Sequence, residues 1–190
     1  MGIKIENVKK SFGKKIVLNG ISMEIPLNKI TAIMGPSGVG KSTLLHILLG
    51  LVSADEGKIS GCTGKKSAVF QEDRLCMNLS GVANIKLVNE KLSVKEIEKD
   101  MERIGLNQCF HQPVKELSGG MRRRISILRA LLSEYDILLT DEPFQGLDED
   151  TKDKVINYMK EKTENKTVIM VTHDRKEAEK LNAEIIYLEV

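Results

Sequence analysis

Apolar residues occur along the chain in short strand-like runs, separated by stretches in which they recur at helical spacing. The strand-like runs lie at 3–8, 16–25, 30–34, 68–70, 137–140, 167–172 and 184–190. The runs at 137–139 and 168–171 are continuously apolar, which is typical of central strands covered on both faces. Helical spacing marks 121–133 and 150–162. Strands that alternate with helices predict an α/β fold with helices on the faces of a sheet.

The segment from about 75 to 116 has a different pattern, with little strand character. Ser93 and Glu96 have the spacing of a capping box, in which a hydroxyl and a carboxylate satisfy the free N–H groups that begin a helix. Apolar residues then follow at steps of three and four up to Gly105, which can end the helix. We therefore predict a helical subdomain at 75–116, inserted in a single domain that spans 1–190.

Composition narrows the class of protein. A chain of 190 residues fits one domain, and 29 basic against 27 acidic residues leave a formal net charge of +2. This balance does not indicate binding to nucleic acid or to a membrane surface. No apolar run reaches the roughly 18 residues of a membrane span, and residues 1–6 lack the apolar core of a signal peptide. We expect a cytosolic chain whose cysteines are free thiols.

The strongest chemical motif is a glycine-rich loop between the strand-like run 30–34 and the helical run 44–49. Its residues are Gly35, Pro36, Ser37, Gly38, Val39, Gly40, Lys41, Ser42 and Thr43. The spacing G-x-x-x-x-G-K-[ST] is that of a phosphate-binding P-loop, whose backbone N–H groups and helix N-terminus face an anion. Lys41 can reach the β- and γ-phosphates, and the Ser42 hydroxyl can ligate Mg²⁺. The alternative is a glycine-rich turn without a ligand.

Two adjacent carboxylates, Asp141 and Glu142, follow the buried strand 137–140. A P-loop ATPase needs a carboxylate that organises Mg²⁺ and a group that orients the attacking water. We predict that Asp141 holds Mg²⁺ through water and that Glu142 polarises the attacking water. Neighbouring strand residues point to opposite faces, so the two carboxylates can take separate roles. The alternative is an acidic turn at the end of a strand.

A second anion site is indicated by Ser118, Gly119 and Gly120, which stand at the start of a basic helix. Two phosphate sites for one nucleotide are hard to explain unless the second serves a neighbouring molecule. Here the chain resembles the ATP-binding cassette (ABC) family, whose signature motif is LSGGQ; this chain has Met121 in place of the glutamine. In that family two nucleotide domains pair head to tail. Each ATP lies between the P-loop of one copy and the signature of the other.

The resemblance implies four further site residues. Phe12 matches the aromatic that stacks on adenine, and its alternative role is an ordinary core residue. Gln71 matches the glutamine that contacts Mg²⁺ or water and senses the membrane partner. Asp148 lies in the loop that communicates across the dimer. His173 matches the switch histidine that contacts the γ-phosphate, and its alternative role is a helix cap.

The predicted fold is therefore a P-loop NTPase core, a mixed sheet flanked by helices, with an N-terminal antiparallel β portion and the helical insertion. The stretches 70–75, 116–124 and 141–144 resemble the nitrate, sulfonate and taurine importer group. The predicted function is ATP hydrolysis that drives solute transport, in the import direction. Expected partners are a second copy of the chain, transmembrane permease subunits and a solute-binding protein. This places the chain at the inner face of the cell membrane. The alternative is an ABC ATPase with a role in assembly, regulation or nucleic-acid processing.

Overall fold

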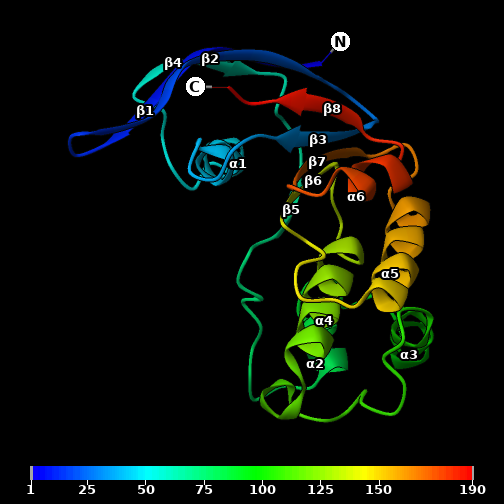
Figure 1. Cartoon of the computed structure of the whole chain (residues 1–190). Helices are drawn as coiled ribbons and strands as arrows, with labels where there is room; N and C mark the ends of the chain where they lie inside the picture. Colours follow the sequence, from blue (N-terminus) through cyan, green and yellow to red (C-terminus); the bar gives the residue numbers. More distant parts are fainter. Residues whose placement is uncertain (1, 190) are drawn as a thin grey trace.

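The strands divide by direction into two sheets, as Figure 1 shows for the computed structural model, which describes residues 2–189. An antiparallel sheet has the strand order β2-β1-β4, and a parallel sheet has the order β5-β6-β7-β3-β8. The strands are β1 (Gly2–Phe12), β2 (Lys15–Pro26), β3 (Ile30–Met34), β4 (Glu56–Ser60), β5 (Lys66–Val69), β6 (Ile137–Asp141), β7 (Thr167–Val171) and β8 (Glu184–Tyr187). The parallel and antiparallel strands expected of the predicted mixed sheet are both present, and they form separate sheets.

One strand, β4, was not expected from the sequence. It pairs with β1 at an edge of the antiparallel sheet, and its side chains are exposed or half-buried. Because Ile59 is its only large apolar residue, it carries neither an apolar run nor a clear alternation. At the other end of the chain, the predicted run 184–190 contains β8, and Val190 lies outside the described residues.

The helices cover the parallel sheet and extend away from it. They are α1 (Lys41–Leu49), α2 (Gly81–Lys86), α3 (Val94–Arg103), the 3₁₀ turn η1 (Val114–Glu116), α4 (Gly119–Leu131), α5 (Glu149–Lys162) and α6 (Arg175–Lys180). In Figure 1, α2 and α3 lie beside α4, far from the antiparallel sheet. The capping box begins α3: the Ser93 hydroxyl accepts from the Glu96 N–H at 3.2 Å, and the Glu96 carboxylate accepts from the Ser93 N–H at 2.7 Å.

The central strands bury side chains on both faces. Leu138 and Met170 enter an apolar cluster with α3 and α4, whereas Leu139 and Ile169 enter a second cluster with α1 and the antiparallel sheet. This alternation follows from the two-residue period of a strand. It explains why the strands β6 and β7 are continuously apolar in sequence.

The register of the parallel sheet brings four loops to one edge. Ile33 pairs with Val171, Val171 pairs with Asp141, and Val69 pairs with Thr140. The residues that follow β3, β5, β6 and β7 therefore leave the sheet at the same carboxyl edge, where ligands bind in open α/β sheets. Within residues 2–189, no helix has the length and apolarity of a membrane span.

Candidate functional site

Two glycines shape the loop after β3. Gly40 caps the N-terminus of α1 with φ 104°, and a Cβ there would lie 2.5 Å from Leu18 Cδ2. Gly35 has φ 151°, and a Cβ there would lie 2.5 Å from the Leu188 carbonyl oxygen. Because a side chain would clash at both positions, only glycine fits this path. The loop thus points the N-terminus of α1, with its free N–H groups, to the carboxyl edge.

The lysine of the P-loop folds back over the loop. Lys41 Nζ donates to the carbonyl oxygens of Gly35 at 2.8 Å and Pro36 at 2.9 Å, and the side chain is mostly buried. The Lys41 ammonium is therefore held near the N-terminus of α1. An anion bound at that N-terminus could accept a further hydrogen bond from it. Ser37 is exposed at the turn, whereas Val39 packs into the core.

A hollow of about 340 Å³ lies over this loop. Its lining residues are Phe12, Lys15, Val17, Gly38, Gly40, Lys41, Ser42 and Thr43. Phe12 is exposed, with the Lys10 ammonium 5.4 Å from its ring centre, so its ring faces solvent instead of the core. The structure thus brings Phe12, which the sequence assigned only by resemblance, next to the predicted phosphate loop.

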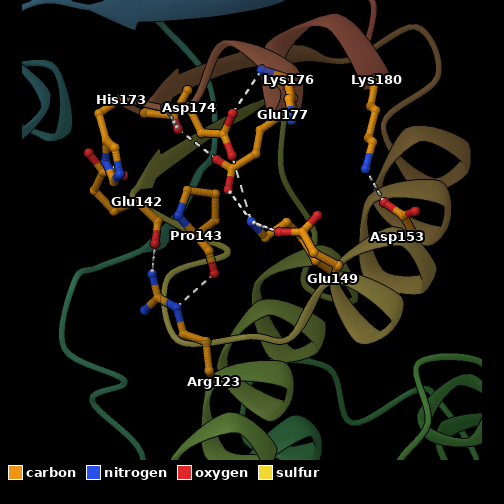
Figure 2. Close-up of polar contacts among 12 residues, drawn as sticks. Arg123, Glu142, Pro143, Glu149, Asp153, His173, Asp174, Lys176, Glu177 and Lys180 are labelled. Carbon is orange, nitrogen blue, oxygen red and sulfur yellow. Dashed lines mark hydrogen bonds and ion pairs between the residues drawn. The ribbon is translucent and has the colours of Figure 1, made fainter.

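The two predicted catalytic side chains form a pair at the carboxyl edge (Figure 2). Glu142 follows the buried Asp141 at the end of β6, and its carboxylate oxygen Oε2 lies 2.8 Å from His173 Nδ1. A carboxylate only accepts, so His173 Nδ1 is the donor. The hydrogen bond to Glu142, followed by its negative charge, raises the pKa of His173 above its ordinary value. The sequence predicted both residues without predicting their contact.

The residues beside His173 are fixed by a polar network. The Thr172 hydroxyl donates to Glu177 Oε2 at 2.6 Å, and Lys152 Nζ lies 3.5 Å from Glu177 Oε1 and 3.7 Å from Asp174 Oδ2. Burial raises the pKa of Glu177. The network joins the first turn of α5 to the loop after β7, so the backbone around His173 is held from two sides.

Oxygen donors suited to Mg²⁺ lie at the same edge. Ser42 is in the first turn of α1, Gln71 follows β5, and Asp141 ends β6. Within the described part of the chain, no group of three or more His, Cys, Asp or Glu side chains could hold a metal ion. A few protein oxygens are nevertheless what Mg²⁺ needs, because it keeps several waters and takes substrate phosphate oxygens as ligands. The donor set therefore fits Mg²⁺.

The predicted second anion site is at the start of α4. Ser118 is the N-cap, and its hydroxyl accepts from the Met121 N–H at 3.3 Å. Asp148 caps α5 in the same way, with its carboxylate 3.0 Å from the Thr151 N–H. Hydrogen bonds from Thr151 lower the pKa of the Asp148 carboxyl. Residues 118–120 contribute nothing to the lining of the hollow over the P-loop. Within one chain, the two predicted phosphate sites are therefore separate.

One buried residue of this region, Arg123, was not predicted from the sequence. Its side chain is 4% exposed, and its guanidinium contacts the turn after β6. A signal was available, because Arg123 precedes Ile127 and Ala130 by four and seven residues and so shares their buried helix face.

Comparison with known proteins decides the family. The model of the family described as ABC transporter matches residues 18–145. The chain belongs to the ABC transporter family. The ABC resemblance inferred from the signature motif is thus confirmed, and the fold is that of an ABC cassette.

Individual relatives agree with this assignment. The lantibiotic transport ATP-binding protein SrtF of Streptococcus pyogenes is 35% identical over 94% of this chain and 83% of its own length. The sulfate/thiosulfate import ATP-binding protein CysA of Mesostigma viride is 37% identical over 98% of this chain, which spans 59% of that relative. The dimeric structure of MJ0796, a bacterial ABC transporter cassette, matches with a TM-score of 0.84 at 31% identity, over 98% of this chain and 94% of that one.

Proposed function

We propose that this ABC ATPase is the motor subunit of a transporter and works as a head-to-tail dimer. ATP binding and hydrolysis in the dimer would drive solute movement through separate membrane subunits. The observation that carries the proposal is the division of the site. The P-loop hollow and the Glu142–His173 pair lie at one sheet edge, while residues 118–120 lie outside that hollow.

The P-loop side of the site would bind the nucleotide. Lys41 would exchange its carbonyl acceptors for phosphate oxygens, and the backbone N–H groups of Gly38 and Gly40 would face the same phosphates. The exposed ring of Phe12 would stack on the base. Ser42, Gln71 and Asp141 would hold Mg²⁺, which neutralises phosphate charge when bound.

Glu142 would act on the attacking water. Its side chain is 18% exposed at the carboxyl edge, within reach of a small molecule but largely sheltered from solvent. His173 holds that carboxylate by a hydrogen bond, and the His173 side chain is 72% exposed. The arrangement fits a base that orients water and a histidine that contacts the terminal phosphate.

The signature residues would complete the site of a second copy. Ser118, Gly119 and Gly120 present a hydroxyl, free N–H groups and the N-terminus of a thirteen-residue helix to the outside of the chain. Asp148, at the neighbouring helix start, would communicate across the same interface. The dimeric structure of the MJ0796 cassette supports the pairing of two copies.

The helical subdomain would dock on the membrane subunits. A hollow of about 740 Å³ lies against α2, with the exposed apolar residues Leu79, Leu87 and Val94 among its lining. A partly apolar surface of this kind suits a helix or loop of a partner protein. Through this contact the chain would sit at the inner face of the membrane. We propose import, the direction named for CysA, with a solute-binding protein as a further partner.

The decisive experiment is Glu142→Gln, which keeps the shape of the side chain and removes its basicity. We expect ATP hydrolysis to fall by about 10²–10⁴-fold. ATP should still bind, so the variant should accumulate as an ATP-bound dimer in size-exclusion chromatography with light scattering. Lys41→Ala is the matched control, because it should remove ATP binding and therefore the dimer. A Glu142→Gln protein that hydrolyses ATP at the unmodified rate would refute the catalytic assignment.

A further inference from the structure

Arg123 holds the turn that carries the predicted catalytic carboxylates. From α4, its Nε donates to the Pro143 carbonyl oxygen at 2.7 Å, and its Nη2 donates to the carbonyl oxygens of Asp141 at 3.0 Å and Glu142 at 2.6 Å. Figure 2 shows the guanidinium directed at Glu142 and Pro143. Three consecutive backbone carbonyls are thus fixed by one side chain.

The same guanidinium also reaches the segment after β5. Its Nη1 donates to the carbonyl oxygens of Phe70 and, at 3.3 Å, Gln71, and lies 3.5 Å from Asp73 Oδ1. Arg123 therefore joins three segments that are distant in sequence: the helix α4, the loop with Gln71 and the turn with Glu142.

Only arginine among the side chains can make this set of contacts. Its planar group carries five N–H donors in a fixed arrangement, and here they meet five carbonyl oxygens on two sides. A buried cation is unfavourable unless its donors are satisfied. The loss of any of these hydrogen bonds would therefore cost more for the charged guanidinium than for a neutral group. Lysine has a single ammonium at the end of a flexible stem and cannot reach both sides together.

The turn needs an external support because its backbone is in an unfavourable conformation. Glu142 has φ 46°, in the left-handed region that residues with a Cβ seldom adopt. Such a conformation persists where surrounding bonds fix it. Glu142 has three: its N–H donates to the Val171 carbonyl at 2.9 Å, and its carbonyl accepts from Arg123 and, at 3.2 Å, from the Gln145 N–H.

We infer that Arg123 is a positioning residue for ATP hydrolysis, which sets Glu142 and Gln71 at a fixed place relative to the helix that starts with the signature motif. The inference rests on the proposed function, since it assigns Arg123 to the same reaction. The hydrogen bonds and the ion pair of Arg123 on these segments go to backbone carbonyls and to Asp73, so its action on catalysis is through Glu142 and Gln71.

Two variants test it in the full chain. Arg123→Lys keeps the charge and loses the planar donors, while Arg123→Gln is neutral, keeps two N–H donors and leaves no uncompensated cation if the lysine variant does not fold. For either variant we expect kcat for ATP hydrolysis to fall about tenfold to a hundredfold, with KM for ATP within about twofold, because the P-loop is untouched. Arg103→Lys is the control: it breaks a paired guanidinium contact, to Glu161, between α3 and α5, and should leave kcat unchanged.

Amide hydrogen exchange separates this inference from the proposed function. In Arg123→Lys without nucleotide, exchange should become faster at 70–74 and 141–145 together and stay unchanged at 35–43. Exchange that is the same as in the parent chain, or an unchanged kcat in a folded variant, would overturn the positioning role. If the parent chain did not hydrolyse ATP, the proposed function would fail, and the exchange measurement would still decide whether Arg123 holds both segments.

Discussion

At the scale of single residues, the contact between Glu142 and His173 predicts a measurable change in proton affinity. The carboxylate raises the pKa of His173 above its ordinary value of 6.5. Since the folded pKa lies above the unfolded one, the pair stabilises the fold fully below about pH 6.5 and less as the pH rises through the folded pKa. Glu142→Gln should return the His173 pKa toward its ordinary value, as followed by NMR titration of the ring protons.

The assignment of that NMR signal comes from His173→Asn, which should remove it from the spectrum. Equal titration midpoints for His173 in the parent chain and in Glu142→Gln would contradict the pairing.

Local motifs made much of the site predictable from sequence, because their spacing fixes their local backbone. The loop at 35–43 is of this kind: the glycines, lysine and hydroxyl of one short stretch meet in one place. The contacts of Arg123 were not predictable in this way. Its partners are backbone carbonyls up to 53 residues away in sequence, and any residue type supplies a carbonyl. The left-handed backbone of Glu142 likewise depends on Val171 and Arg123 instead of on its own side chain.

At the scale of elements, the start of α3 offers a local test. Ser93 satisfies the Glu96 N–H with its hydroxyl, and Glu96 returns a bond to the Ser93 N–H. Ser93→Ala removes the hydroxyl acceptor and should lower the free energy of unfolding by about 1 kcal/mol, measured by urea unfolding. Lys99→Ala, an exposed substitution within the same helix, should change it far less. An unchanged urea midpoint for Ser93→Ala would show that the cap is not needed for this helix.

Elements differ in how much of their stabilisation comes from their own sequence. The strands at 30–34, 137–141 and 167–171 were predictable because burial on both faces requires apolar residues throughout. β4 was not predictable, because an exposed edge strand does not need apolar residues throughout. It forms through pairing with β1, in which Ile5 lies opposite Ile59, and its Gly57 lies close against the backbone of Asn7, at φ 89°.

At the scale of the whole molecule, the position of the two predicted phosphate sites determines how many chains make one active site. If each chain hydrolysed ATP alone, every defect would stay confined to its own chain. If two chains pair head to tail, the P-loop of one works with residues 118–120 of the other, and the two contacts of a symmetric pair are equivalent. Two variants with different defects can distinguish these arrangements.

The first variant is Lys41→Ala, which removes the ammonium that we propose binds phosphate. The second is Gly120→Asp, which places a carboxylate against the phosphates of a paired chain. A Cβ at Gly120 would make only ordinary contact, 3.6 Å from Leu147 Cδ2, and an acidic residue suits the first turn of α4. The second variant should therefore fold normally, and each variant alone should hydrolyse little ATP.

Mixing the two variants should restore activity. A mixed dimer joins the intact P-loop of the Gly120→Asp chain to the intact signature of the Lys41→Ala chain, so one of its two sites is complete. Each mixed dimer has one complete site out of two, which predicts at most about half of the unmodified ATPase rate for an equimolar mixture. Chains that worked alone would gain nothing from mixing, because each would keep its own defect. A mixture no more active than its separate components, at concentrations where the parent chain dimerises with ATP, would rule out the shared site.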